Sequence, residues 1–448
     1  MKIDSAIKRV SDIIELWIPQ KMKCEDVPGM SIGIFFKGKL LYQKGFGYFD
    51  VQKKRRMRPD DLYRVASMSK MFTATAILQL QEQSKLKLND RVSKYLPWFK
   101  GKNRVGDLSK ITLRQVLSHT SGLFRDGEKP YWFSHKFPKK LNDTISDRAI
   151  IFKNSKRFKY SNHGYALLGD VIKTVSGQTY SEYIQENILN LLGMRSTYPD
   201  LEKKALSRLA RGYGRVLPEK KRKQEAFPNV PTYAYAPATG FISNVGDLAR
   251  FLNSLILRSS GPQILSEKSK RMMTKLWTKT SKTSYYGLGL SITKAGRRKY
   301  VGHGGGFAGY VTQSLINPQD KCGVIVLSNS LENQSYNISR GIFDTLYYFT
   351  DKRIRKNAAT YPYTGVYRDR WGDMVIASAD NSLISFGVKT NNPVSNDKIL
   401  LRPIGKHSFR LEMEDGFGSP GELVVFSLFK NGKAQKLLWS SNPMIRIS

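Results

Sequence analysis

The spacing of apolar residues changes along the chain, and each period predicts a different kind of element. Near the N-terminus, apolar residues recur at helical intervals between polar ones, at Ile3, Ile7, Val10, Ile14 and Trp17. This pattern predicts an amphipathic helix. Residues 30–50 instead contain two strand-like runs that meet at Lys37-Gly38, which predicts a β-hairpin.

Helical spacing dominates the middle of the chain. Four predicted helices begin at Ser67, Thr112, Asn162 and Thr179, and the last two end at Gly177 and Gly193. Strand-like segments return between residues 285 and 328, and residues 335–351 predict one more helix. This order indicates an α+β fold in which one antiparallel sheet, built from both ends of the region, is flanked by helices and carries an inserted helical subdomain.

The C-terminal part of the chain contains only short strand-like segments. A basic, proline-bearing stretch precedes them, and Asn431-Gly432 within them is typical of a hairpin turn. The sequence therefore predicts a large domain at residues 1–350, a basic linker at 351–360 and a small all-β domain at 361–448.

Composition limits the classes of protein that need to be considered. The chain has 448 residues and only two cysteines, Cys24 and Cys322, whose distant positions predict neither a disulfide framework nor a zinc site. No metal or organic cofactor is expected. The sequence has no apolar run of membrane-spanning length and lacks the pattern of a secretory signal, so a soluble, cytoplasmic protein is expected.

The formal net charge of +38 is extreme. Most basic residues are scattered, with denser runs at residues 53–58, 220–223 and 352–356. Such a charge attracts nucleic acid and anionic lipid, but no sequence pattern of a nucleic-acid-binding fold accompanies it. A solvated basic surface is the favoured interpretation. Weak contact with a polyanion or an anionic membrane is the alternative, and no specific nucleic acid partner is predicted.

The predicted helix from Ser67 carries two groups that could react together. Residues three apart share a helix face, so the Ser67 hydroxyl and the Lys70 amine can meet. Unpaired N–H groups at the helix start favour negative charge that develops near Ser67, the candidate nucleophile. Desolvation in an apolar helix makes a neutral, proton-accepting Lys70 attainable. Taken alone, such a pair is more often a capping serine with a surface lysine.

Tyr160 and Asn162 stand at the start of another predicted helix. Beside a cationic lysine the phenolate form of Tyr160 is favoured, which would supply a second base, and Asn162 can donate a hydrogen bond to a substrate carbonyl. Taken alone, the two residues are as easily a packed aromatic ring and a capping amide.

The third candidate segment is His303 followed by Gly304, Gly305 and Gly306. Glycines let a substrate lie against the backbone, where a free N–H can donate to an oxyanion. The glycine spacing also matches the dinucleotide-binding fingerprint by letter, but strand-like sequence follows where that fold requires a helix. The His-Gly-Gly-Gly run resembles the oxyanion segment of lipases, yet the sequence has no Gly-x-Ser-x-Gly elbow.

The order and spacing of Ser-x-x-Lys, Tyr-x-Asn and His-x-Gly resemble the serine β-lactamase and penicillin-binding-protein superfamily. The resemblance is greatest to its class C-like branch, which includes D-aminopeptidases and related esterases, and it spans about residues 28–348. Further segments agree with that branch, at residues 113–123, 180–194, 237–252 and 285–290. The C-terminal part resembles the small lipocalin-like, barrel-like β domain that often follows such catalytic domains.

The resemblance implies a role for each candidate residue. Ser67 would form the acyl-enzyme, Lys70 and Tyr160 would move its proton, and Asn162 would orient the substrate. The N–H groups of Ser67 and Gly306 would hold the oxyanion. By the same resemblance His119 is structural, and His163 is expected to be a first-turn helix residue.

One departure from the family pattern affects the expected substrate. His303 stands where many relatives have lysine, so a permanent cation that would bind a substrate carboxylate is missing. Ester or amide hydrolysis of a small molecule or short peptide is therefore expected ahead of efficient β-lactam hydrolysis or carboxypeptidase action. A true β-lactamase remains a further possibility. A different class of function also stays open, a catalytically weak scaffold whose basic surface binds nucleic acid, anionic lipid or a protein partner. The sequence leaves the oligomeric state open.

Overall fold

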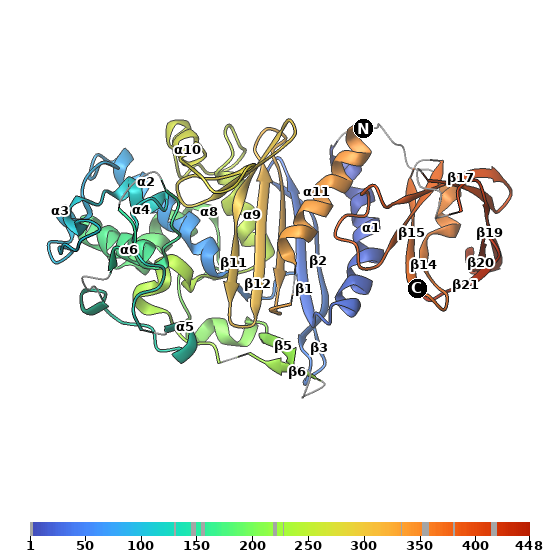
Figure 1. Cartoon of the computed structure of the whole chain (residues 1–448), viewed down its shortest axis with the longest axis horizontal. Helices are drawn as coiled ribbons and strands as arrows, with labels where there is room; N and C mark the ends of the chain where they lie inside the picture. Colours follow the sequence, from blue (N-terminus) through green and yellow to red (C-terminus); the bar gives the residue numbers. More distant parts are fainter. Residues whose placement is uncertain are drawn as a thin grey trace. The chain divides into compact units, whose positions relative to one another are not determined.

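The chain folds into two units, shown in a computed structural model (Figure 1). One unit consists of Pro28–Tyr336, and the other of Met1–Val27 with Asn337–Ser448. The structure describes residues 3–129, 131–144, 149–153, 157–217, 222–226, 228–332, 334–351, 358–379, 381–413 and 419–448. The basic run at residues 352–356, and with it most of the predicted linker, lies outside the described residues, as do Lys220 and Lys221. The domain limits at residues 350 and 361 therefore stay a prediction.

An antiparallel sheet of nine strands crosses the first unit in the described part of the chain, in the order β3-β2-β1-β13-β12-β11-β10-β9-β8. Strand β1 pairs with β2 in the predicted hairpin and with β13 on its other side, with Met30 opposite Ser328. The two ends of the region therefore build one sheet, as predicted. The strands are β1 (Gly29–Phe36), β2 (Lys39–Asp50), β3 (Arg55–Arg56), β8 (Thr278–Lys279), β9 (Ser284–Tyr286), β10 (Ser291–Ala295), β11 (Arg298–Phe307), β12 (Tyr310–Asn317) and β13 (Cys322–Ser328).

Helical segments lie between β3 and β8 in sequence and form the inserted block (Figure 1). The helix predicted from Ser67 begins differently, because Ser67 lies in a 3-10 turn and the α-helix starts at Ser69. The segments used below are η1 (Ala66–Met68), α2 (Ser69–Glu82), α4 (Leu113–Leu117), α6 (Asn162–Ser176), α7 (Tyr180–Ile184), η5 (Gln185–Leu189), α8 (Asn190–Leu192), η6 (Lys203–Arg208), η9 (Ala236–Gly240), α9 (Val245–Ser254) and α10 (Glu267–Met273).

Two of the predicted helix ends are confirmed. Gly177 and Gly193 follow α6 and α8 with φ angles of 77° and 64°, which glycine adopts without the steric cost that other residues incur. The helix predicted from Thr179 to Gly193 is interrupted by the π-helical turn η5 between α7 and α8.

The core of this unit surrounds α2. Every residue from Ser69 to Leu80 is buried, and the Phe72 ring stacks on Phe241 and Phe251 with centroid separations of 4.4 and 3.8 Å. Stacked aromatic rings of this size contribute strongly to core packing. A helix enclosed on all sides can therefore present Lys70 to a dry environment.

Two short strands link the start of α2 to the start of α9. Strand β4 (Tyr63–Arg64) pairs antiparallel with β7 (Ile242–Ser243), and the pairing continues because the Val65 N–H donates to the Phe241 carbonyl at 2.9 Å. The turn η1 follows β4 and η9 precedes β7, so both meet at one end of this ladder.

The second unit contains a closed barrel of eight described strands, which confirms the predicted barrel-like domain. The helix α1 (Ile3–Cys24) belongs to this unit, where Trp17 Nε1 donates to the Thr390 carbonyl at 3.0 Å and Lys21 Nζ to the Lys389 carbonyl at 3.1 Å. Most of the helix α11 (Ser335–Asp351) also belongs to this unit, which begins again at Asn337. The barrel strands are β14 (Gly365–Arg368), β15 (Asp373–Ala379), β16 (Ser382–Gly387), β17 (Ile399–Gly405), β18 (Ser408–Glu412), β19 (Leu423–Lys430), β20 (Lys433–Trp439) and β21 (Asn442–Arg446). Among the described residues, no helix has the length and apolar character needed to span a bilayer.

Candidate active site

Ser67 lies in a constrained turn between β4 and α2. The preceding residue, Ala66, has a φ of +47°, a conformation that non-glycine residues adopt rarely and at a cost. Ser69 holds this turn, because its Oγ donates to the Ala66 carbonyl at 2.5 Å and accepts from the Phe241 N–H at 3.1 Å. Ser67 is thereby placed between the sheet and the helical block.

Lys70 is fully buried and its Nζ lies 3.1 Å from the Ser67 Oγ. The same nitrogen donates to Asn162 Oδ1 at 2.6 Å and to the Ala238 carbonyl at 2.8 Å. Burial lowers the pKa of Lys70 well below its ordinary value, while the charge of Asp126 opposes and that of Arg125 adds to this shift. The desolvated lysine that the sequence analysis predicted therefore lies in contact with the Ser67 hydroxyl.

Tyr160 contacts the same hydroxyl, since its OH donates to Ser67 Oγ at 2.8 Å. The expectation that a phenolate would be favoured is wrong for the resting site, because burial raises the pKa of Tyr160 despite the opposing effects of the Ser67 hydrogen bond and Arg125. Tyr160 rests as a neutral phenol and hydrogen-bond donor. Of the two candidate bases, Lys70 has the shift in pKa that suits proton acceptance.

Asn162 connects Lys70 to a carboxylate that the sequence did not single out. Its Nδ2 donates to Asp126 Oδ1 at 2.5 Å, and Arg125 Nε donates to the other oxygen of Asp126 at 3.1 Å. Ser161 is the residue that caps α6, because its Oγ accepts from the Gly164 N–H. The amide of Asn162 is therefore engaged at both ends in the free protein, and a substrate carbonyl would compete with Asp126 for its donor.

The three glycines lie on β11 beyond the point where β10 stops pairing with it. The β10–β11 register ends at Gly302, whereas β12 continues to pair through Gly306. A Cβ on Gly305 would lie 2.1 Å from the Val65 carbonyl oxygen, so only glycine lets β11 approach the Ser67 turn this closely. A Cβ on Gly306 would meet no atom within 4 Å, which leaves room for a ligand beside the strand.

His303 does not present a cation to a substrate. The residue is 5% exposed, its Nδ1 lies 2.6 Å from the Gly304 carbonyl and its Nε2 lies 2.9 Å from the Tyr286 hydroxyl. Because a carbonyl can only accept, Nδ1 carries the proton and Nε2 accepts from Tyr286. Burial and the charge of Lys70 lower the pKa of His303 to about 3, so the ring is neutral at ordinary pH.

His119 holds Tyr160 by the residues on either side of it. The Lys159 N–H donates to the His119 carbonyl at 2.7 Å, and the Ser161 N–H donates to His119 Nδ1 at 3.1 Å. The imidazole also lies against the Tyr160 ring, with centroids 4.3 Å apart. This arrangement agrees with a structural role for His119. His163 lies in the first turn of α6, as expected, and contacts the Tyr235 hydroxyl at 2.9 Å.

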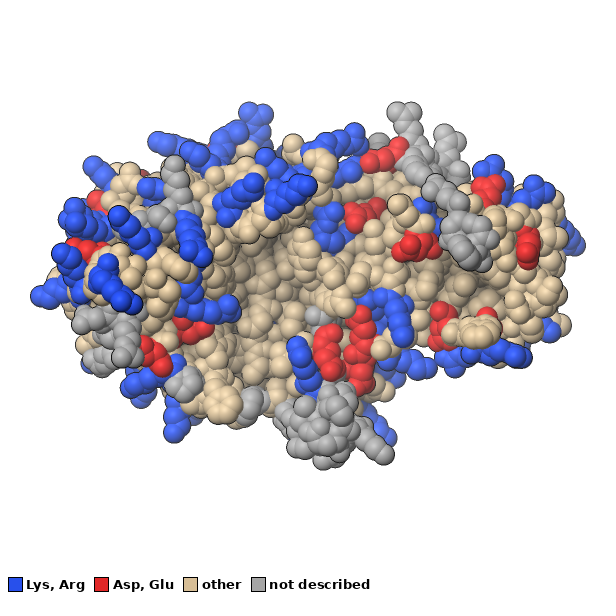
Figure 2. All heavy atoms as spheres, viewed as in Figure 1, with Lys and Arg blue, Asp and Glu red and all other residues tan. Residues whose placement is uncertain are grey.

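The surface around this region is basic at its margins and less charged within. Lys and Arg side chains are spread over the face shown in Figure 2, and the part that overlies β11 and β12 is hollowed and carries few charged side chains. The predicted site residues lie on η1, α2, β11 and the segment around the start of α6, and these elements contact one another.

Comparison with known proteins places this geometry in a family. The profile of the Beta-lactamase family matches residues 14–348. Protein flp of Staphylococcus aureus (strain MW2) is 39% identical over 189 residues, which are 41% of this chain and 37% of that protein, so the match spans little more than a third of this curated relative. Penicillin-binding protein 4* of Bacillus subtilis (strain 168) is 29% identical over 321 residues, which are 67% of each protein.

Solved structures agree. The octameric penicillin-binding protein homologue from Pyrococcus abyssi has a TM-score of 0.64 at 25% identity and covers 98% of this chain and 100% of that chain. D-amino acid amidase from Ochrobactrum anthropi shares the fold, with a TM-score of 0.62 at 22% identity over 77% of this chain and 99% of that chain. The resemblance to the serine β-lactamase and penicillin-binding-protein superfamily is thus confirmed. Because the family profile covers most of the chain and contains every candidate residue, the chain belongs to the Beta-lactamase family.

Proposed function

We propose that the protein is a serine acyl hydrolase that cleaves an ester or amide bond through an acyl-Ser67 intermediate. The observation that carries this proposal is the position of Ser67 Oγ, 3.1 Å from Lys70 Nζ and 2.8 Å from the Tyr160 hydroxyl. A nucleophile in contact with a base and a neutral acid is the arrangement that acyl transfer requires. Membership of the Beta-lactamase family supports it.

In the acylation step, neutral Lys70 takes the proton of Ser67 as Oγ attacks the substrate carbonyl carbon. The new C–O bond makes a tetrahedral oxyanion, which the N–H groups of Ser67 and Gly306 would bind beside the open space at Gly306. As the C–N or C–O bond to the leaving group breaks, Tyr160 gives its proton to that group and regains one from the Lys70 ammonium.

Deacylation reverses these roles, with water in place of the leaving group. Neutral Lys70, directly or through Tyr160, takes a proton from water, and the hydroxide oxygen attacks the acyl carbon. Collapse of the second tetrahedral species returns the proton to Ser67 and releases the acid.

The substrate we favour is a small ester or amide, or a short peptide, without a carboxylate at the place where His303 lies. His303 is neutral and both of its ring nitrogens are engaged, so this position offers no permanent cation. β-Lactams carry such a carboxylate and are expected to react less well. The comparisons give no support to the alternative of a catalytically weak binding scaffold.

Intact-mass spectrometry after incubation with a fluorophosphonate, and separately with a penicillin, tests the proposal. We expect one fluorophosphonate adduct per chain that peptide mapping places on Ser67, and slower or no labelling by penicillin. Ser67→Ala should remain folded by circular dichroism and should lose the adduct.

Two results would overturn the proposal. Folded wild-type protein that reacts with neither reagent lacks an active nucleophile. An adduct that persists in Ser67→Ala would place the nucleophile elsewhere. Rapid turnover of penicillin would retain the acyl-enzyme route but replace the favoured substrate with a β-lactam.

A further inference from the structure

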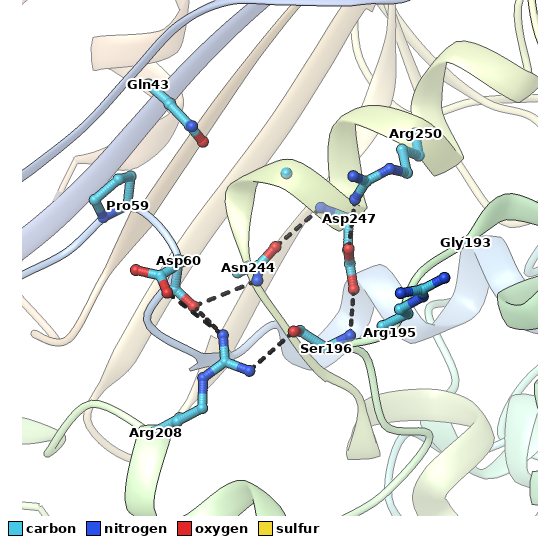
Figure 3. A pocket seen from close by; sticks show the side chains of 11 residues that line it. Gln43, Pro59, Asp60, Gly193, Arg195, Ser196, Arg208, Asn244, Asp247 and Arg250 are labelled. Atoms are coloured by element: carbon cyan, nitrogen blue, oxygen red, sulfur yellow. Dashed lines mark hydrogen bonds and ion pairs between the residues drawn. The ribbon is translucent and has the colours of Figure 1, made fainter.

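A polar hollow of about 510 Å³ opens at the other end of the β4–β7 ladder from Ser67 (Figure 3). Five segments meet there: β2, the loop before β4, the loop between α8 and η6, the end of η6, and α9 with the residue before it. Three arginines stand around it, each from a different segment. The lining residues are Gln43, Pro59, Asp60, Gly193, Arg195, Ser196, Arg208, Asn244, Gly246, Asp247 and Arg250.

Two of the arginines are held in place by hydrogen bonds. Arg208 Nη1 donates to Ser196 Oγ at 3.0 Å and its Nη2 donates to the Asp60 carbonyl at 2.9 Å. Arg250 Nη1 donates to Asp247 Oδ1 at 2.7 Å. A guanidinium has five N–H donors, so each of these groups keeps donors for a ligand. Groups already ordered lose little conformational entropy when a ligand binds.

The third arginine is free. Arg195 is exposed and forms no hydrogen bond or ion pair with any residue that the structure describes. Figure 3 draws no dashed contact to its side chain. Arg195 is therefore available to close on a ligand held by the other two.

The two carboxylates of the hollow offset part of this charge but leave an excess of one arginine among the lining residues. Asp247 is 4% exposed, and besides Arg250 its oxygens accept from the Ser196 N–H at 2.8 Å and Thr197 Oγ1 at 2.9 Å. Asp60 has a side chain that is 65% exposed and lies 3.7 Å from Arg208, so solvent screens it.

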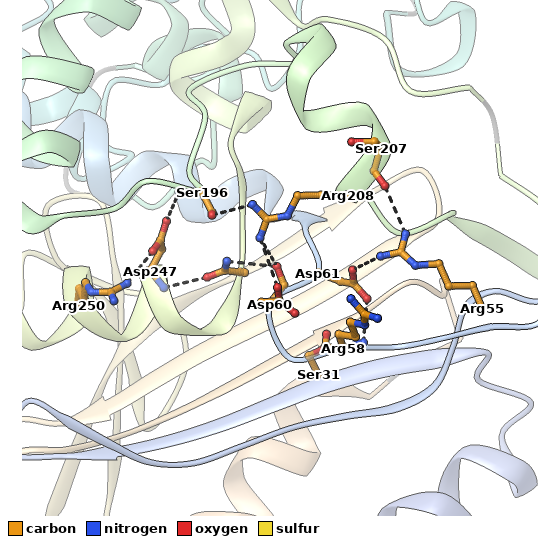
Figure 4. Close-up of polar contacts among 11 residues, drawn as sticks. Ser31, Arg55, Arg58, Asp60, Asp61, Ser196, Ser207, Arg208, Asp247 and Arg250 are labelled. Carbon is orange, nitrogen blue, oxygen red and sulfur yellow. Dashed lines mark hydrogen bonds and ion pairs between the residues drawn. The ribbon is translucent and has the colours of Figure 1, made fainter.

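The loop that carries Asp60 is held by hydrogen bonds of its neighbouring residues. Asp61 accepts from Arg55 Nη2 at 2.6 Å and from the Arg58 N–H at 2.8 Å (Figure 4). The Ser31 hydroxyl also donates to the Arg58 carbonyl at 3.2 Å. The backbone carbonyl that accepts from Arg208 therefore belongs to a loop that these three hydrogen bonds hold in place.

We propose that this hollow is a binding site for a phosphate group, free or carried by a small molecule, with Arg195, Arg208 and Arg250 as its ligands. Arginine matches the oxygens of phosphate in pairs of parallel hydrogen bonds, which single surface charges do not provide. Gly246, which lines the hollow, lies in the first turn of α9, where the helix dipole favours an anion.

The site is separate from the catalytic turn. Asn244 and Asp60 lie beyond the Tyr63–Ser243 end of the β4–β7 ladder and are joined by a hydrogen bond of 3.3 Å from Asn244 Nδ2 to the Asp60 carbonyl. Ser67 follows the opposite end of the ladder. Binding in the hollow therefore does not require the Ser67 chemistry, and the proposal stands or falls independently of the proposed function.

Isothermal titration of the full chain with inorganic phosphate and with glycerol 1-phosphate, at constant ionic strength in chloride, tests the proposal. We expect one saturable site. Arg195→Gln and Arg250→Gln should each weaken binding at least about tenfold, since one bidentate contact is worth roughly that factor. Tighter binding of inorganic phosphate would identify the free ion as the ligand, and tighter binding of the monoester would identify a phosphorylated small molecule.

Two control variants make the result specific. Arg258 has a side chain that is 82% exposed, lies outside the hollow and is paired only loosely, 3.7 Å from Glu267, so Arg258→Gln should bind phosphate as the wild type does. Ser67→Ala should also bind unchanged, which separates the hollow from the catalytic site. The proposal is overturned by an absence of saturable binding, by unchanged affinity in Arg195→Gln, or by an equal loss in Arg258→Gln.

Discussion

The two ends of the β4–β7 ladder place positive charge in opposite surroundings. At one end, Lys70 is fully buried next to Ser67, and burial lowers its pKa well below the ordinary value. At the other end, Arg195 and Arg250 are exposed. An arginine keeps its charge under nearly all conditions, whereas a buried lysine gives up its proton readily.

The two surroundings show how one highly basic chain can have a reactive amine at one place and bind anions at another. A net charge of +38 identifies neither site. Desolvation lowers the pKa of an amine, so that the amine can accept a proton. An exposed guanidinium that is held by hydrogen bonds stays charged and can bind an anion. Base catalysis is therefore expected only where the basic side chain is buried.

The largest effect is expected when the buried amine of Lys70 is removed. Lys70→Met keeps an unbranched side chain that is one atom shorter but removes the base, so labelling of Ser67 by a fluorophosphonate should slow by about 10³-fold or more, as expected for loss of general-base catalysis. The rate of adduct formation, followed by intact mass, measures this effect.

A second buried lysine provides the matched control. Lys270 in α10 is 2% exposed, donates to the Ile256 carbonyl at 3.1 Å, and has a pKa that burial lowers. Lys270→Met should leave the labelling rate near that of the wild type. An equal loss of labelling in both variants would mean that folding, and not proton transfer, explains the effect of Lys70→Met.

The next largest effect concerns the close approach of β11 to the Ser67 turn. Gly305→Ala would place a Cβ 2.1 Å from the Val65 carbonyl oxygen, so the free energy of unfolding should fall by about 1–3 kcal/mol as the backbone shifts. Urea denaturation measures it. Gly306→Ala meets no atom within 4 Å and should stay within about 0.5 kcal/mol of the wild type. Similar losses in both variants would contradict the assigned packing.

The sequence predicted the part of the site that depends on spacing. The three-residue step from Ser67 to Lys70, and the position of Tyr160 and Asn162 at a helix start, determine local geometry. Apolar periods likewise determined the sheet and its helical block. These features follow from short-range rules that hold wherever the segment packs.

The rest depends on contacts between distant segments. Asp126 reaches Asn162 from another loop, and the Ala238 carbonyl reaches Lys70 from η9. Neither has a distinctive spacing in sequence. The resting state of Tyr160 was predicted wrongly because the lysine charge was counted and burial was not. The hollow lined by Arg195, Arg208 and Arg250 was not predicted, because these residues do not form a recognisable motif in a chain with many arginines.

A smaller effect on the free energy of unfolding is expected at the end of the β4–β7 ladder where the arginines lie. Asn244 caps α9, since its Oδ1 accepts from the Asp247 N–H at 2.9 Å. Asn244→Ala should lower the free energy of unfolding by about 1 kcal/mol through loss of the cap. Thermal denaturation measures this change, and Ser67 labelling should keep its wild-type rate. A large loss of labelling in this variant would show that the two ends of the ladder are not independent.

The finest test shifts the pH dependence of acylation without removing a reacting group. Acylation requires neutral Lys70, so its rate should rise with pH through the lowered pKa of that amine. The charge of Asp126 raises this pKa and the charge of Arg125 lowers it. Asp126→Asn should therefore move the midpoint of the rate profile to lower pH, and Arg125→Gln should move it to higher pH. Stopped-flow labelling across pH measures both midpoints.

The opposite signs make this pair of variants informative. A general loss of structure would slow labelling in both variants without moving their midpoints in opposite directions. His303 cannot imitate the effect, because its pKa of about 3 leaves it neutral throughout the relevant range. Shifts of the same sign in both variants would mean that the titrating group is not Lys70. The contrast between a buried lysine that acts as a base and exposed arginines that bind an anion would then lose its physical basis.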